Sequence, residues 1–270
     1  MNELRLPLLE TSAECGRDFT LEIMATREDM LGRIRAALGR TPHQSAAARA
    51  PEGLFPPLGP VLAPIPPDEV VTKFEQELEK VSGCAYRATD GSQLENLLRK
   101  ILEDRHASSV VLSRNPLLRE LALARKIESW GLAVASYSEP SVEAAEADNK
   151  RIFRERAFVA EVGITGVDFV LAESGSLVLT SLTEGAQLAS LAPPVHIALY
   201  RRSHVLATLE EVLERLPVPR DPEAPLPGRS VVFITGPSRT ADIEQILIRG
   251  VHGPKEVHAI LVEDACLSRR

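Results

Sequence analysis

The stretch Ser-Val-Val-Leu-Ser-Arg-Asn-Pro, residues 109–116, decides the fold that the sequence predicts. Its first half, Ser109–Ser113, is a short apolar run that predicts a strand buried on both faces. Asn115 and Pro116 then supply the cap and the first-turn proline that favour the start of a helix, which is expected to reach Trp130. A buried strand that leads directly into a helix is typical of an α/β fold.

The same alternation of strands and helices continues along residues 68–270. Helical stripes are expected over 70–81 and 92–102, and a polar stretch follows around 139–151. Glu-Ser-Gly-Ser at 173–176 predicts a hairpin or sharp bend between two strands. The predicted strands are 85–88, 109–113, 132–137, 168–172, 177–181, 195–200, 231–235 and 257–262. The predicted fold class is therefore α/β, a mostly parallel sheet with helices on both faces.

Residues 1–67 are expected to form a separate N-terminal part. Thr26 can cap a helix whose apolar side chains share one face. From Thr41 to Pro67 the chain is rich in proline, which excludes a regular element and predicts a linker or arm. The apolar side chains of this arm favour contact with a surface, of this chain or of a partner.

Composition limits the classes of function. The 270 residues carry a formal net charge of -7 and a sequence pI near 5.5, so no general attraction to nucleic acid or to an anionic membrane is expected. Cys15, Cys84 and Cys266 are far apart and form no Cys-x-x-Cys pair, so this chain is expected to hold no iron–sulfur cluster and no metal. Sparse cysteines and the lack of a membrane-length apolar run favour a cytoplasmic protein.

Four glycine-bearing stretches are candidates for a ligand site: 163–168, 172–176, 236–244 and 250–254. In open α/β sheets, ligands bind where strand ends meet loops, so these stretches are expected to form one polar cleft for a small anion. The candidate ligand-binding residues are Gly163, Thr165, Gly175, Gly236, Ser238, Arg239, Thr240 and Asp242.

Arg239 is the candidate anchor of the anion. Its guanidinium offers a planar fork for a carboxylate or phosphate. A short helix that begins near Thr240 would add free backbone N–H groups. The alternative is a structural turn in which Asp242 and Glu244 pair with Arg239 and leave no site.

Glu173 and His252 are the candidate catalytic residues. Glu173 lies between two apolar runs, where a charge is costly unless it is paired or catalytic, although it can also be a turn residue in water. His252 can carry a proton or can simply bond to nearby backbone. A metal site from Glu173, Asp242 and His252 lacks a spaced ligand pair, and Glu-Ser-Gly-Ser lacks the two-glycine elbow of a serine hydrolase.

Five motifs in series resemble the LUD-domain family, and within it the short LutC (YkgG) type. They are Gly-Ile-Thr-Gly-Val-Asp-Phe at 163–169, Ala-Glu-Ser-Gly-Ser-Leu-Val-Leu-Thr at 172–180, Val-His-Ile-Ala at 195–198, Phe-Ile-Thr-Gly-Pro-Ser-Arg-Thr-Ala-Asp-Ile-Glu at 233–244 and Gly-Val-His-Gly-Pro at 250–254. The resemblance implies a fold similar to the NagB/RpiA/CoA-transferase group. It also implies oxidation of L-lactate to pyruvate together with LutA-like and LutB-like partners, in which the iron–sulfur clusters are expected.

Three functions remain open from the sequence. The first is an accessory or substrate-binding subunit of an iron–sulfur-dependent L-lactate oxidation system that binds a small carboxylate. The second is a free-standing enzyme on a sugar-phosphate or CoA substrate with Glu173 as base or nucleophile, by analogy with CoA transferases of similar fold. The third is a non-catalytic scaffold whose arm, residues 41–67, docks a partner.

Overall fold

The computed structural model describes residues 27–37, 64–137, 143–185, 187–216, 230–241 and 247–267. Contacts divide the chain into two units, Met1–Val61 and Leu62–Arg270. In the first unit, helix α1 (Arg27–Ala37) confirms the helix expected after Thr26, and none of its residues is buried. Most of the proline-rich arm lies outside the described residues.

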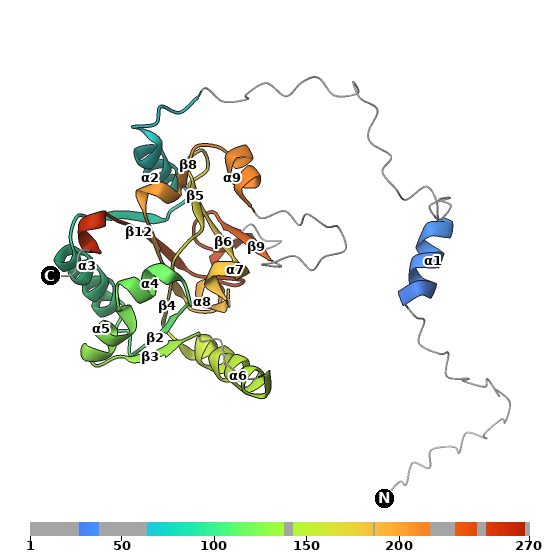
Figure 1. Ribbon diagram of the computed structural model, residues 1–270, viewed down its shortest axis with the longest axis horizontal. Coiled ribbons are helices and arrows are strands. Elements are labelled where there is room, and N and C mark those ends of the chain that lie inside the picture. The colour runs from blue at the N-terminus through green and yellow to red at the C-terminus, as the bar shows by residue number, and fades with distance from the viewer. Residues whose placement is uncertain are drawn as a thin grey trace, which may run out of the picture. The chain divides into compact units, whose positions relative to one another are not determined.

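The second unit is built on a six-stranded sheet in which every neighbouring pair of strands is parallel (Figure 1). The strand order is β1-β12-β7-β4-β2-β3. The bounds are β1 Cys84–Ala88, β2 Ser109–Leu112, β3 Ala133–Ser136, β4 Val162–Thr165, β7 Val195–Tyr200 and β12 Glu256–Val262. Every residue of β4 and β7 is buried, as both faces of a parallel sheet require. The predicted parallel α/β sheet is confirmed.

A second sheet of four strands has the order β8-β5-β6-β9. Its members are β5 Phe169–Leu171, β6 Ser176–Thr180, β8 Val205–Leu206 and β9 Val231–Ile234. The expected hairpin at 173–176 is confirmed, because β5 and β6 pair antiparallel with Leu171 opposite Ser176. A separate antiparallel pair joins β10 (Arg239–Ala241) to β11 (Leu247–Arg249).

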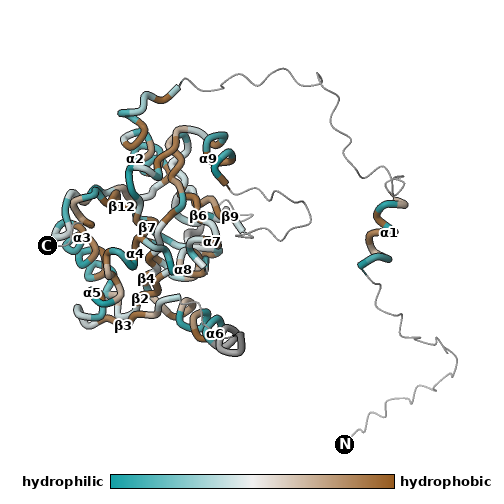
Figure 2. The backbone as a smooth tube through the Cα atoms, in the orientation of Figure 1, coloured by the Kyte–Doolittle hydropathy of each residue, from teal (hydrophilic) through white to brown (hydrophobic). Residues whose placement is uncertain are grey.

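Helices cover both faces of the six-stranded sheet, as predicted. Side chains alternate along each strand, so Ile197 and Leu199 of β7 face one core and Ala198 and Tyr200 face the other. On the first face lie α3 (Gly91–Asp104), α4 (Pro116–Glu120) and α5 (Leu123–Ser129). On the second lie α2 (Val70–Lys80), α6 (Glu143–Val159), α8 (Leu188–Leu191) and the four-stranded sheet. Figure 2 shows the hydrophobic residues gathered along these strands and on the inner sides of the helices.

Two helix predictions need correction. The helix expected from Pro116 to Trp130 is two short helices, because the chain turns at Ala122, whose φ is 50°. The polar stretch around 139–151 contains the start of α6, a helix of 17 residues. Few apolar side chains mark α6; Phe153 and Ala157, one turn apart, pack it against Val111 of β2.

Two loop predictions are also wrong. The stretch 163–168, predicted as a loop before a strand, instead begins inside the inner strand β4, Val162–Thr165. Arg239–Ala241 is a strand rather than the start of a helix, since Thr240 pairs with Ile248 in the β10–β11 hairpin. The remaining short elements are α7 (Ser181–Glu184), α9 (Leu209–Arg215) and the 3-10 turns Arg202–His204 and Asp264–Cys266. Among the described residues, no helix is both long and apolar enough to cross a membrane.

Candidate functional site

Three of the four predicted glycine-bearing stretches come together, beside the C-terminal half of α2. The hydroxyls of Ser176 and Thr235 lie 2.7 Å apart and join the β5–β6 turn to the end of β9. The Ser238 N–H donates to the Pro254 carbonyl at 2.8 Å, so the stretches after β9 and before β12 also touch. Three of the four stretches that were expected to converge therefore lie in contact, and binding of a ligand by them stays a prediction.

The glycines of this region serve close packing against α2. Gly175 has φ +65°, and a Cβ there would lie 2.2 Å from the backbone nitrogen of Leu78. Gly236 has φ +77°, and its Cβ would lie 2.7 Å from the carbonyl oxygen of Val81. Both positions need a glycine for conformation and for space, and a ligand-binding role for them stays a prediction.

Arg239 is engaged with the C-terminal end of α2. Its Nη2 donates to the Val81 carbonyl at 2.6 Å and to the Ser82 hydroxyl at 2.5 Å. A cation at this position is favourable because the last helical carbonyls carry partial negative charge. The expected run of free helix N–H groups at Thr240 does not exist, because the residue lies in strand β10. Asp242 lies outside the described residues.

Glu173 is bound to another helix end. Its Oε1 accepts a hydrogen bond of 2.9 Å from the N–H of Leu209, the first residue of α9. A carboxylate at a helix N-terminus neutralises the partial positive charge there, which is a structural use of the side chain. His252 is exposed. Catalytic roles for Glu173 and His252 stay predictions.

The fourth stretch, 163–168, lies apart from the other three. Gly163 is fixed by α8, since a Cβ there would lie 1.8 Å from the carbonyl oxygen of Ala189. The buried Thr165 hydroxyl lies 2.8 Å from Nε2 of His196, and burial lowers the pKa of His196 to about 3, so this histidine is neutral. Asp168 lies beside Val178 and Thr180, at the opposite end of the β5–β6 hairpin from Gly175. The four stretches thus do not form one cleft.

The neighbouring strands β2 and β4 are followed by connections that run to opposite faces of the sheet. Such a switch point in an open α/β sheet leaves a crevice between the two connections. After β2, residues 113–115 lead into α4 on one face of the sheet. After the neighbouring β4, residues 166–168 lead into β5, which packs on the other face. The Asn115 side chain of the first connection lies against Gly166 of the second.

Glu184 is the centre of this polar cluster and is completely buried. Its Oε1 accepts a hydrogen bond from the side-chain amide of Asn115, and its backbone carbonyl accepts one of 3.2 Å from the Arg114 N–H. Gly166 has no room for a side chain, because a Cβ there would lie 2.1 Å from the Asn115 side chain. Glu184 therefore holds the β2–α4 connection against β4.

The protonation of Glu184 is set mainly by burial, which raises its pKa to about 7. Ser113, Asn115 and Gly166 lower this pKa, and the charge of Asp168 raises it. Among the described residues, Oε2 has no hydrogen-bond partner. Glu184 can gain or lose a proton near neutral pH.

Polar groups next to Glu184 extend the cluster. Asp168 accepts hydrogen bonds from the Thr180 N–H at 2.6 Å and from the Thr183 hydroxyl at 2.9 Å. Two more buried atoms, Oγ1 of Thr180 and Nδ1 of His204, have no hydrogen-bond partner within the described part of the chain. Buried polar atoms are usually satisfied, so this concentration marks a functional site better than the loops beside α2 do.

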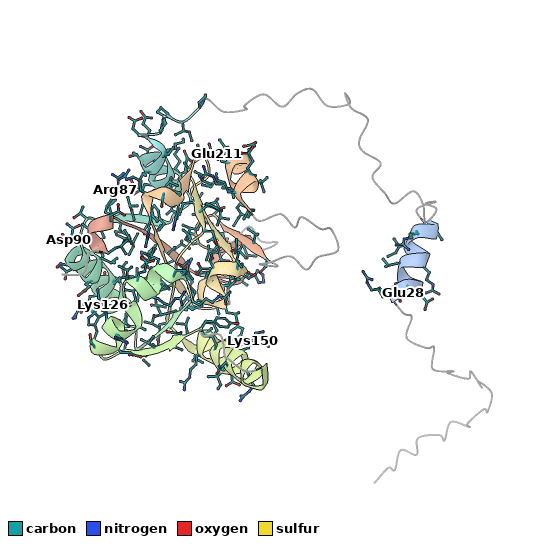
Figure 3. All side chains as sticks on the ribbon, in the orientation of Figure 1. Glu28, Arg87, Asp90, Lys126, Lys150 and Glu211 are labelled. Carbon is teal, nitrogen blue, oxygen red and sulfur yellow. The ribbon has the colours of Figure 1, made fainter. Side chains whose placement is uncertain are left out.

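An open cleft of about 1250 Å³ adjoins the cluster through Ser113 and Thr183, which line it, while Glu184 itself does not. Ser113, Arg114 and Thr183 form its inner wall, and α4 and α5 form one side. Four cationic side chains line it against one acidic side chain: Arg114, Arg119, Arg125 and Lys126 against Glu120. Lys126 is labelled on α5 in Figure 3. This lining favours an anionic ligand, in contrast to the acidic chain as a whole.

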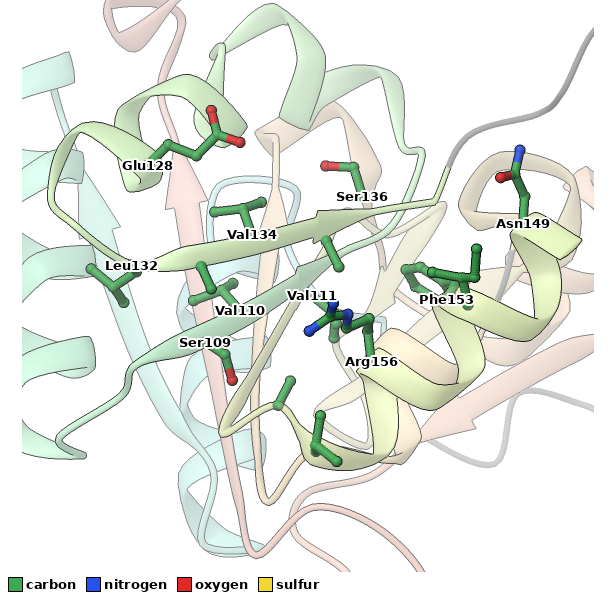
Figure 4. Close-up of a pocket in the computed structure, with 15 residues that line it drawn as sticks. Ser109, Val110, Val111, Glu128, Leu132, Val134, Ser136, Asn149, Phe153 and Arg156 are labelled. Carbon is green, nitrogen blue, oxygen red and sulfur yellow. The ribbon is translucent and has the colours of Figure 1, made fainter.

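A second cavity of about 570 Å³ lies between α6 and the edge of the sheet (Figure 4). Phe153 and Arg156 project from α6 toward β2 and β3, whose Val110 and Val134 form the opposite wall. Its lining is largely apolar and includes only Glu128 and Arg156 as charged side chains. It therefore lacks the concentration of polar groups found around Glu184.

The described ranges contain no cluster of metal-binding side chains and no disulfide. No group of three or more His, Cys, Asp or Glu side chains is placed there to hold a metal ion. Cys84 is half-buried and Cys266 buried, and both are free thiols.

Sequence reasoning missed Glu184, Ser113 and Asn115 as site residues. Asn115 was used only as a helix cap, a role it does fill through a 3.0 Å bond from the Leu117 N–H. The available signal was Thr-Glu-Gly at 183–185, which places a carboxylate at the end of the short helix α7 that follows the buried strand β6. Its burial depends on β4 lying beside β2, and that pairing was not predicted.

Comparisons with known proteins identify the family of this chain. A family model described as the LUD domain matches residues 71–262. The protein named Lactate utilization protein C from Halalkalibacterium halodurans is 29% identical over 238 residues, which cover 88% of this chain and 98% of that protein. The protein of the same name from Bacillus subtilis is 29% identical over a match that covers 88% of this chain and 96% of that protein. Among solved structures, a DUF162 family protein from Deinococcus radiodurans matches 74% of this chain and 99% of its own, with 18% identity and a TM-score of 0.45.

Proposed function

Because the chain belongs to the LUD domain family, we propose that it is the substrate-binding subunit of an L-lactate oxidation system. The names of its relatives support a role in lactate utilization. The cluster around Glu184 supports substrate binding, because this carboxyl group has a buried oxygen without a partner among the described residues and lies next to a cation-lined cleft. That single observation carries the proposal.

L-Lactate would enter the cleft as an anion and meet Arg114 and Thr183 at its inner wall. Arg114 would contact the carboxylate with its guanidinium group, whose Nη2 also donates to the Leu182 carbonyl at 2.7 Å. Its backbone N–H and the amide of the next residue, Asn115, are both bonded to Glu184. Glu184 is buried and would act as a positioning residue that sets where the Arg114 side chain begins.

Oxidation of lactate to pyruvate breaks the C2–H and O–H bonds, forms a C=O bond and releases two electrons and two protons. In this proposal the electrons pass to iron–sulfur clusters in LutA-like and LutB-like partner proteins. This chain contributes binding and orientation of the substrate. Its described residues include no metal-binding group of their own, and the proposal requires none.

The binding role is tested by titrating the purified chain with L-lactate at several pH values. Above a pKa of about 7 the Glu184 carboxyl becomes an anion close to Arg114. Its charge would then oppose the lactate carboxylate, so affinity should fall by roughly tenfold between about pH 6 and about pH 8. Glu184→Gln keeps the shape and removes the ionisation, so its lactate affinity should be nearly independent of pH.

The matched control is Glu214→Gln, which changes an exposed glutamate on α9. It should keep the pH dependence of the unmodified chain. An identical pH profile for Glu184→Gln and the unmodified chain would remove Glu184 from the account. Lack of saturable lactate binding at any of these pH values would remove the substrate-binding role itself.

The partner role is tested by gentle affinity purification from the native cell. The account expects recovery of cysteine-rich iron–sulfur proteins, recognised by their visible absorption and by bound iron. Recovery of the chain alone under conditions that preserve other weak complexes counts against a multi-protein system.

A further inference from the structure

The cleft extends well beyond the cluster around Glu184. We propose that its outer part, along α4 and α5, binds a phosphate-bearing organic anion of about nucleoside-diphosphate size through Arg119 and Arg125. This ligand is distinct from lactate, and its binding does not depend on the proposed role in lactate oxidation.

Charge is the first observation that carries the proposal. Of the charged side chains in the lining, Lys126 pairs with Glu95 at 2.8 Å and Glu120 pairs with Arg201. Within the described part of the chain, Arg119 and Arg125 have no acidic partner, and both are exposed. The cleft thus keeps two unneutralised guanidinium groups in a chain whose formal net charge is -7.

Geometry is the second observation. Arg119 lies on α4 and Arg125 on α5, and both line the same cleft. The bend between the two helices is at Ala122, an exposed non-glycine residue with φ +50° that also lines the cleft. This left-handed conformation costs a residue with a Cβ on the order of 1 kcal/mol. Such strain concentrates at functional sites, and here it joins the two arginine-bearing helices at one cleft.

Chemistry and size select the ligand class. Guanidinium groups bind phosphate oxygens through paired, charge-assisted hydrogen bonds. Ligand pockets usually span roughly 300–1,000 Å³, so a cleft of about 1250 Å³ has room for a nucleotide as well as a three-carbon acid. Pro116, Leu118 and Tyr137 in the lining supply apolar surface for the organic part.

The experiment is isothermal titration of the full chain with adenosine diphosphate and, separately, with inorganic pyrophosphate. The unmodified chain should bind at least one probe saturably. The double variant Arg119→Ala, Arg125→Ala should lose roughly tenfold or more in affinity, because it removes charge-assisted hydrogen bonds. Both side chains are exposed, so the fold should persist, and thermal unfolding checks that it does.

Matched controls separate this site from general charge and from the lactate site. Arg154→Ala removes an exposed cation on α6, outside the cleft, and should leave probe affinity within about twofold of the unmodified chain. Glu184→Gln should keep probe binding even if lactate binding fails. Tighter binding of the nucleotide identifies an organic phosphate, and equal binding of pyrophosphate identifies the phosphate groups as sufficient. The proposal is overturned if Arg154→Ala weakens probe binding as much as the double variant does. It is also overturned if neither probe binds saturably.

Discussion

Glu184 is the residue at which burial and charge conflict most directly. A carboxyl group out of contact with water favours its neutral form, and its neighbours compensate only in part. Glu173, the carboxylate that the sequence favoured, accepts a hydrogen bond from the N-terminus of α9, where a negative charge is favourable. The difference could not be read from residue type, because each glutamate follows or precedes an apolar strand. Only the position of β4 beside β2 buries one of them.

The stability of the fold should depend on the ionisation of Glu184. Its pKa is raised from 4.5 to about 7 in the folded chain, so the folded state holds the proton more tightly than the unfolded state. The free energy of unfolding should therefore fall as pH rises from about 4.5 to about 7, by on the order of 3 kcal/mol. Urea unfolding of Glu184→Gln across this range should lack that decline, and an unchanged decline would contradict the assigned pKa.

Gly163 provides a test of packing at a single position. A methyl group there would lie 1.8 Å from a backbone oxygen of α8, which cannot move without displacing the helix. Gly163→Ala should lower the free energy of unfolding by roughly 1–3 kcal/mol or more. Gly91→Ala is the control, because its nearest heavy-atom contact would be an ordinary 3.8 Å. Equal effects in denaturant unfolding would refute the close approach of α8 to β4.

At the scale of elements, the sequence predicted strands and helices best where their periodicity was strong. Ser109–Leu112 and Val195–Tyr200 are apolar runs, and both are parallel strands. Val162–Thr165 was missed because two glycines, at 163 and 166, resemble a loop. Those glycines record close contacts with α8 and with Asn115, which exist only in the folded chain. The strand could not be predicted from the local sequence pattern, because the reason for its glycines is tertiary packing.

The contact of Arg239 with the C-terminal end of α2 is expected to stabilise the fold. Its guanidinium donates to the carbonyl of Val81, the cap residue of that helix. Arg239→Ala should lower the free energy of unfolding by about 1 kcal/mol. Chemical denaturation measures this directly, with Arg154→Ala on α6 as a matched removal of an exposed arginine. Loss of lactate binding by a variant that keeps full stability would restore the predicted ligand role of Arg239.

At the scale of the whole molecule, the account depends on where the chain changes its winding direction. The loops beside α2 gather three of the predicted stretches, yet their polar groups are used to join β5, β6, β9 and α2. The crevice between β2 and β4 instead holds Glu184, whose buried Oε2 has no hydrogen-bond partner in the described chain. The family resemblance predicted the domain and its fold class. The candidate site could be identified only from the order of the strands in the sheet.

A crystal structure of the chain soaked with L-lactate would locate the bound lactate carboxylate. The account predicts the lactate carboxylate at the inner wall of the cleft, in contact with Arg114 and within reach of Thr183. Lactate bound instead beside Arg239 and His252, with the crevice between β2 and β4 empty, would contradict it.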